Sequence, residues 1–277
     1  MNDEQLIEKL KKILLDEVDL LCSPENCSDW QKPIHATINE INERKWNAVF
    51  FGGALRSLLL SKLTNAKVNN KLVKPRDIDI VIENVTVDDL HDRFNKYVRR
   101  DTYFDGLQLE RDGLKFDIWP LDETYVLGTS HFQYDIPEFV DLPSTTFLNL
   151  EAVAIETSPK PGHQRQIYSG DDQFFKGIIN KTIELNWEDH PSPELCVTRA
   201  LILSATLQWK IGPHLLDYIA GYGAKMRPSK FTSLQTNYHG VVNWSESFFE
   251  KSIKEICSIA HERETQGIEL PWDSLKG

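Results

Sequence analysis

Two aspartates that are separated by one residue stand at the start of an apolar run, Asp77-Ile78-Asp79-Ile80-Val81-Ile82. On a strand, residues two apart point to the same face, so both carboxylates would lie side by side. Adjacent anions repel each other unless a positive group lies between them, and a divalent metal ion fills that role well. The alternative is a solvated face of an edge strand, but the apolar neighbours favour a buried strand. We therefore treat Asp77 and Asp79 as candidate metal ligands.

A third carboxylate, Asp117, lies in another apolar run, Phe116-Asp117-Ile118-Trp119. A carboxylate in such surroundings needs a partner. Asp117 is either a structural residue or the third member of a three-carboxylate site for two metal ions.

A glycine pair follows the first apolar strand, in Phe51-Gly52-Gly53-Ala54-Leu55-Arg56-Ser57. Glycines let the backbone approach a ligand closely, and helix N-termini favour anions. A phosphate-binding turn is one interpretation, and a tight turn without any ligand is the other.

The elements that must position these residues follow from periodicity and turn signals. Apolar spacing predicts two N-terminal helices, and Asp112-Gly113 predicts a hairpin. The sequence predicts an α+β protein with a mixed sheet flanked by helices, followed by an all-helical C-terminal region. The expected helices are 4–21, 28–44, 54–63, 87–97, 174–180, 193–209, 215–222, 229–238 and 244–263, and the expected strands are 47–51, 77–82, 107–110 and 114–119. The expected divisions are N-terminal helices over 1–44, a mixed α/β region over 45–158 and a helical region over 159–277.

This order of motifs resembles the nucleotidyltransferase fold of the DNA polymerase β superfamily. Within that superfamily, the closer resemblance is to the class II tRNA nucleotidyltransferases, which add CCA, and to bacterial poly(A) polymerases. In that family a Gly-Gly-x-Val-Arg-Asp stretch precedes an Asp-x-Asp strand, and residues 51–56 and 76–79 resemble these two motifs. The resemblance covers residues 45–210, and it is strong at the two motifs and faint elsewhere. It implies that 45–158 is the catalytic head and that 159–277 is a neck-like region.

The resemblance implies a function for each candidate. Asp77, Asp79 and Asp117 would bind two Mg²⁺ ions, and Asp117 would lie close to the attacking hydroxyl. The nucleotide-binding residues would be Gly52, Gly53, Arg56, Arg76 and Arg199. The implied reaction moves a nucleoside monophosphate from an NTP such as ATP to a hydroxyl, and the favoured acceptor is an RNA 3′ end, as in tRNA.

The sequence departs from the family pattern at three places. Ser57 stands where the family usually has Asp, and Ser144-Thr145-Thr146 replaces a basic and acidic group. The neck motif Glu-Asp-x-x-Arg, which reads the incoming base in the family, aligns with residues 192–196. Glu194 and Arg199 are the nearby polar replacements, or else they are an ordinary helix-terminal acid and a surface arginine.

Composition narrows the class of protein. The chain has 277 residues and a formal net charge of −11, which argues against a broad nucleic-acid footprint but leaves room for a local basic face. An acceptor on a protein or small molecule, a protein partner, and a catalytically silent nucleotide-binding module are the alternatives. No membrane association is expected. The four scattered cysteines favour a reduced cytoplasmic protein without a zinc site.

A group of aromatic residues follows Asp117: Trp119, Tyr125, Phe132 and Tyr134. These rings would form either a base-stacking wall or part of the core.

Overall fold

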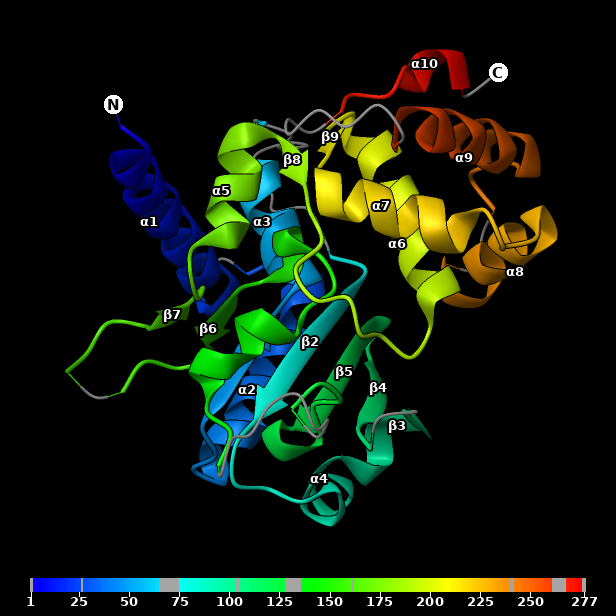
Figure 1. Cartoon of the computed structure of the whole chain (residues 1–277). Coiled ribbons are helices and arrows are strands. Elements are labelled where there is room, and N and C mark those ends of the chain that lie inside the picture. The colour runs from blue at the N-terminus through cyan, green and yellow to red at the C-terminus, as the bar shows by residue number, and fades with distance from the viewer. Residues whose placement is uncertain are drawn as a thin grey trace. The chain divides into compact units, whose positions relative to one another are not determined.

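The structure is a computed structural model, which describes residues 2–25, 27–64, 75–102, 105–127, 136–160, 162–239, 242–260 and 268–275. The chain divides into two compact units, and each is described by itself (Figure 1). The first contains residues 1–146 and 150–176, and the second contains residues 147–149 and 177–277. The predicted α+β class is confirmed.

The helices and strands alternate through the first unit and become mostly helical in the second. The α-helices are α1 (Asp3–Cys22), α2 (Lys32–Glu43), α3 (Gly53–Leu63), α4 (Val87–Phe94), α5 (Gln173–Asn180), α6 (Pro193–Leu207), α7 (Pro213–Gly223), α8 (Pro228–His239), α9 (Glu246–Ala260) and α10 (Trp272–Leu275). The strands are β1 (Ala48–Phe51), β2 (Asp77–Ile82), β3 (Val98–Asp101), β4 (Leu107–Arg111), β5 (Leu114–Pro120), β6 (Ala154–Glu156), β7 (Ile167–Tyr168), β8 (Thr182–Ile183) and β9 (Lys210–Ile211). Short 3₁₀ helices include η4 (Leu121–Glu123), η5 (Phe139–Thr145) and η6 (Asn149–Glu151).

Seven strands of the first unit form one sheet, in the order β3-β4-β5-β2-β1-β6-β7. Among the described residues every neighbouring pair in this sheet is antiparallel except β2 and β5, which run parallel. A parallel pair needs a crossover connection. Here that crossover contains α4, β3 and β4 (Figure 1).

The two faces of this sheet differ because side chains alternate along each strand. The residues with even numbers on the central strands β2 and β5, such as Ile78, Ile80 and Phe116, are fully buried. Asp77 and Asp79 on β2 and Asp117 on β5 occupy the opposite face and remain partly exposed. Helix α3 packs against β1 and β2, and α4 packs against β4 and β5. Because the odd-numbered face stays partly open at the aspartates, these helices cover the even-numbered face.

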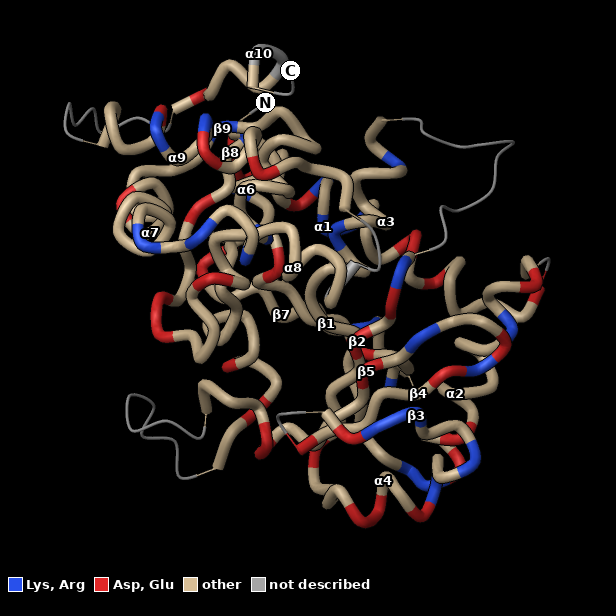
Figure 2. The backbone as a smooth tube through the Cα atoms, turned by 90° about the vertical axis from the view of Figure 1, so that its right-hand side faces the viewer, with Lys and Arg blue, Asp and Glu red and all other residues tan. Residues whose placement is uncertain are grey.

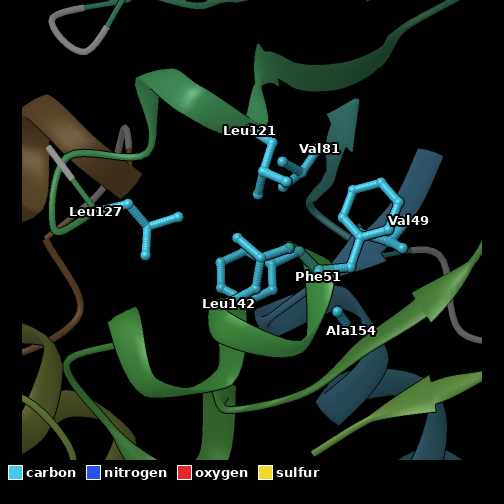
Figure 3. Close-up of a cluster of buried hydrophobic side chains, with 8 residues drawn as sticks. Val49, Phe51, Val81, Leu121, Leu127, Leu142 and Ala154 are labelled. Atoms are coloured by element: carbon cyan, nitrogen blue, oxygen red, sulfur yellow. The ribbon is translucent and has the colours of Figure 1, made fainter. Parts of the chain in front are cut away.

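The odd-numbered face becomes apolar toward the far end of β2. Val49 and Phe51 of β1, Val81 of β2 and Ala154 of β6 form a buried cluster there. Figure 3 shows that these side chains pack against three leucines that follow β5. They are Leu121 in η4, Leu142 in η5, and Leu127, which lies between these two helices. One face of the sheet is therefore polar at one end of β2 and sealed at the other.

The N-terminal helices are built into the first unit. Asn2 caps α1 by accepting a hydrogen bond from the backbone N–H of Gln5, and the Gln5 side chain accepts one from the Asn2 backbone. Glu17 of α1 is buried and pairs with Lys62 of α3 at 2.5 Å. This ion pair compensates for a carboxylate that would otherwise be buried without a partner.

The first unit extends beyond residue 158, where the sequence placed the end of the head. Strand β7 pairs with β6 in the same sheet, and Arg165 binds Asp19 of α1 at 2.7 Å. Residues 150–176 consequently belong to this unit.

The second unit is mainly helical, with a small parallel sheet of β8 and β9 that the sequence did not predict. Glu184, just after β8, accepts hydrogen bonds from the backbone N–H groups of Leu185 and Leu215. Leu215 lies in the first turn of α7, so Glu184 caps that helix from outside. A two-residue strand has too short a pattern to be distinguished from a loop by its sequence.

Within the described residues, no helix is both long enough and apolar enough to cross a membrane.

Candidate active site

Asp77, Asp79 and Asp117 share one face of the central strands. Asp79 lies directly opposite Asp117 in the parallel register of β2 and β5. Asp77 is on the same face as Asp79, one strand repeat away, and its side chain is 27% exposed. The strand register thus brings the three predicted carboxylates together at the open end of this face.

The surroundings of Asp117 work against its negative charge. Burial raises the pKa of the Asp117 carboxyl, and the nearby charge of Asp77 raises it further. A hydrogen bond from Gln108 Nε2 to Asp117 Oδ1, 3.0 Å long, lowers the same pKa. Arg100 and Arg76 also lower it through their positive charges.

Arg76, which the sequence placed among the nucleotide-binding residues, contacts one of the carboxylates. Its Nη2 lies 2.6 Å from Asp77 Oδ2, and its Nε lies 2.9 Å from the same oxygen. Both side chains are partly exposed to solvent, so this ion pair contributes little to the free energy of unfolding. Arg76 thus pairs with one of the candidate metal ligands.

The glycine turn lies next to these aspartates. Phe51, the last residue of β1, is opposite Asp79 in the antiparallel register of β1 and β2. Gly52 has a positive φ of 68° and immediately precedes α3. A β-carbon at Gly52 would lie 3.9 Å from Asp79 Oδ2. The N-terminus of α3, whose first N–H groups have no acceptor within the helix, thus opens beside a candidate metal ligand.

Arg56, in the first turn of α3, forms a mostly buried ion pair with Glu151 of η6. The distance from Arg56 Nη1 to Glu151 Oε1 is 3.2 Å, and the side chains are 17% and 11% exposed. Its neighbour Ser57, which replaces the Asp usual in the family, donates a hydrogen bond to the Gly53 carbonyl. Arg56 is held by a carboxylate that lies far away in the sequence.

The carboxylates suit Mg²⁺ by their chemistry. Among the described residues no group of three or more His, Cys, Asp and Glu side chains is arranged so that it could hold a metal ion. Mg²⁺ is usually bound by one or two carboxylates together with water and substrate phosphates, rather than by a complete protein cage. The pair Asp77 and Asp79 fits that mode, and the three-carboxylate set stays a prediction.

Residues that lie opposite one another on adjacent strands form a row across the sheet that ends at Asp79. From the edge strand inward it contains Arg100 on β3, Gln108 on β4 and Asp117 on β5, before reaching Asp79. In Figure 2 the acidic segments of β2 and β5 lie beside each other, with the basic residues of β3 at the edge of the same sheet. Positive and negative side chains are therefore arranged in sequence along one face.

The residues that replace the family's base-reading pair belong to the second unit. Pro193 is the first residue of α6, and Cys196 is fully buried in its interior. Glu194 is exposed and Arg199 is half-buried on the same helix. Neither Pro193 nor Cys196 offers a base the paired hydrogen-bonding groups of the family motif.

The aromatic residues after β5 are only partly described. Trp119 meets Phe51 edge to face at 6.1 Å between ring centroids, and its Nε1 donates to Thr124 Oγ1 at 3.0 Å. Trp119 is therefore part of the packing around the buried cluster. Tyr125 is 37% exposed, and Phe132 and Tyr134 lie outside the described residues.

Two residues of this region were not singled out from the sequence. In the sequence analysis Gln108 is only one residue of the predicted strand 107–110. Its position opposite Asp117 nevertheless follows from the Asp112-Gly113 turn. Glu151 pairs with Arg56 across 95 positions, and no local pattern reports such a contact.

No family model and no curated protein sequence matches this chain. Its structure is similar to that of the Thermotoga maritima CCA-adding enzyme complexed with tRNA, with a TM-score of 0.58 and 15% identity, over 88% of this chain and 55% of that one. It is also similar to a CCA-adding enzyme in complex with CTP, with a TM-score of 0.57 and 15% identity, over 89% of this chain and 54% of that one. A third similar structure is a CCA-adding enzyme in complex with ATP, with a TM-score of 0.55 and 16% identity, over 86% of this chain and 53% of that one.

These likenesses establish that the chain has the fold of the CCA-adding enzymes, as the sequence motifs predicted. The chain spans little more than half the length of these solved structures.

Proposed function

We propose that this protein is a Mg²⁺-dependent nucleotidyltransferase. It moves a nucleoside monophosphate from an NTP to an acceptor hydroxyl and releases pyrophosphate. The favoured acceptor is the 3′ end of an RNA, as in tRNA.

One observation carries this proposal. Asp77, Asp79 and Asp117 share a face of the sheet directly beside the Gly52 turn at the N-terminus of α3. Carboxylates suit a metal ion, and a helix N-terminus suits a phosphate, so the two features together suit a metal-bound triphosphate. The solved structures with this fold include complexes with CTP, ATP and tRNA, which supports the same substrate classes here.

Each residue has a part in this proposal. The backbone N–H groups at Gly53 and the start of α3 bind phosphate oxygens, with Arg56 held in reach by Glu151. Arg76 exchanges its contact with Asp77 for the triphosphate. Asp77 and Asp79 hold the metal ions, and Asp117 lies beside the attacking hydroxyl. When bound, Mg²⁺ would lower the pKa of that hydroxyl and neutralise the charge that develops on the leaving pyrophosphate.

A second acceptor class has one observation in its favour. The chain carries a net charge of −11, which disfavours binding along a long stretch of RNA phosphates. Transfer to a protein side chain or a small molecule keeps the same chemistry and avoids that repulsion.

The test uses the full chain with each of the four NTPs in turn, labelled on the α-phosphate, with Mg²⁺ and total cellular lysate. Product that is sensitive to RNase supports the RNA acceptor, and product that is sensitive to protease supports the protein acceptor. EDTA should abolish the labelling. The matched control is Asp79→Asn, which keeps the side-chain volume but removes the charge. Absence of label with every NTP would refute the transferase and favour a nucleotide-binding module.

A further inference from the structure

Gln108 is the neighbour of Asp117 on the side away from Asp79. In the antiparallel register of β4 and β5 the two residues are directly opposite each other, and both side chains are half-buried. Gln108 Nε2 donates to Asp117 Oδ1 at 3.0 Å. Within the described part of the chain this is the hydrogen bond that the Asp117 side chain receives, and it leaves the second carboxylate oxygen to other partners.

The chemistry of the donor matters as much as its distance. A lysine or arginine at position 108 would pair with Asp117 and cancel its charge, so that the carboxylate would compete poorly for a metal ion or a hydroxyl proton. The amide of Gln108 is uncharged and gives Asp117 one hydrogen bond through its NH₂ group. Gln108 can therefore orient Asp117 without placing a positive charge beside it.

The fold also keeps Gln108 itself in place. Its strand neighbours Leu107 and Leu109 are buried on the opposite face, which fixes the direction of the side chain between them. Strand β4 is paired on both sides, with β3 and with β5. A residue on a strand that is held in this way orients its partner more rigidly than a residue on a loop.

We propose that Gln108 is a positioning residue of the transfer reaction, which fixes the orientation of the Asp117 carboxylate through one of its two oxygens. This inference rests on the proposed nucleotidyl transfer. It adds a residue outside the three carboxylates and predicts that Gln108 acts only through Asp117.

The variants are Gln108→Leu, which removes the hydrogen bond at similar volume, and Gln108→Glu, which keeps the shape but cannot donate at neutral pH. The matched control is Glu110→Leu, on the same strand and the same face, where Glu110 pairs with Arg99 instead. Thermal melting of all three variants establishes that they are folded, and either Gln108 variant alone is sufficient if the other does not fold.

The first readout separates kcat from KM. We expect both Gln108 variants to lose kcat by about 10- to 100-fold, as is typical when a residue that orients a site ligand is removed. In both Gln108 variants the KM for the NTP should change by less than about threefold, because Gln108 does not contact the groups assigned to the triphosphate. The Glu110→Leu control should retain wild-type kinetics.

The second readout is a double-mutant cycle with Asp117→Asn, followed over long incubations. If Gln108 acts through Asp117, then Gln108→Leu should cause no further loss in the Asp117→Asn background. Multiplicative losses, or a Gln108→Leu enzyme as active as Glu110→Leu, would overturn the positioning role while leaving the transferase intact. A wild-type chain that labels nothing with any NTP would overturn both proposals at once.

Discussion

Gly52 faces the carboxylate of Asp79: a β-carbon on this glycine would lie 3.9 Å from Asp79 Oδ2. This proximity links the two parts of the site, because Gly52 precedes the helix N-terminus and Asp79 belongs to the carboxylate face. The backbone at Gly52 has a φ of 68°, which side-chain-bearing residues rarely adopt.

The first prediction concerns this backbone conformation. Gly52→Ala should lower the free energy of unfolding by about 1–3 kcal/mol, because the new β-carbon strains a conformation with positive φ. Gly53→Ala is the matched control: Gly53 is the first residue of α3, and a β-carbon there would lie 3.6 Å from Arg56 Nη2, an ordinary contact. Urea denaturation of both variants measures the difference. Equal stabilities would show that the turn is not strained in this way.

The second prediction concerns the paired carboxylates. Asp77→Ala and Asp79→Ala should each abolish transfer while the protein stays folded. Removing one of two neighbouring like charges relieves repulsion and leaves the strand intact, but it removes a metal ligand that the transition state needs. Transfer assays and thermal melting are run on the same samples. Wild-type activity in either variant contradicts the assignment of that residue.

The third prediction concerns the buried ion pair. Glu151→Ala should destabilise the protein by about 2–3 kcal/mol, because it leaves the guanidinium of Arg56 mostly buried without this partner. Replacing both residues, as Arg56→Met with Glu151→Leu, should restore most of the loss, since no unpaired charge then remains. Guanidinium denaturation of the single and double variants decides the matter. A double variant that is less stable than Glu151→Ala would show that the charges matter for another reason.

The fourth prediction concerns base choice. Pro193 and the buried Cys196 provide no hydrogen-bonding edge at the start of α6, and strong discrimination requires polar groups that a wrong base would leave unpaired. The protein should therefore use several NTPs within about tenfold of one another, which corresponds to about 1.4 kcal/mol. If it does prefer one base, Glu194→Ala or Arg199→Ala should relax that preference. Steady-state kinetics with four NTPs on one acceptor measure it, and strict C-then-A addition to a tRNA lacking CCA would contradict the prediction.

The fifth prediction is a pH dependence at the start of α4. The Thr86 hydroxyl and backbone N–H donate to Asp89, which lowers the pKa of that carboxyl below its ordinary 3.8. A carboxyl whose pKa is lower in the folded than in the unfolded state stabilises the protein at every pH above its unfolded-state pKa. This stabilisation is lost as the pH falls through the folded-state pKa. Asp89→Ala should thus melt below wild type at pH 7, with a gap that closes below pH 3.8. Asp88→Ala, in the same turn, is the control and should show a smaller gap.

The fold class and the resemblance to CCA-adding enzymes could be predicted from the sequence because both depend on local patterns. The alternation of polar and apolar residues in Asp77-Ile78-Asp79-Ile80 predicts which face of β2 is buried, and the Gly52-Gly53 pair predicts the turn into α3. The residues around Asp117 left two interpretations open, a structural role or a third carboxylate of the site, and the family resemblance favoured the second. Its position opposite Asp79 depends on which strands pair.

Contacts between distant residues could not be predicted in this way. The pair of Arg56 with Glu151 and the two-residue strand β7 arise only when the sheet is complete, and neither leaves a periodic signal. The same holds for β3, an edge strand whose last three residues are charged and exposed and whose sequence Val-Arg-Arg-Asp resembles a loop.

The parallel pairing of β2 with β5 in the large sheet also sets an order of assembly. Asp77 and Asp79 are synthesised before the crossover of α4, β3 and β4, while Asp117 comes after it. The carboxylate face therefore cannot be completed by a local hairpin and must wait for the whole crossover to fold back beside β2. During translation the nascent chain thus carries the glycine turn and the first two aspartates well before it can assemble the site.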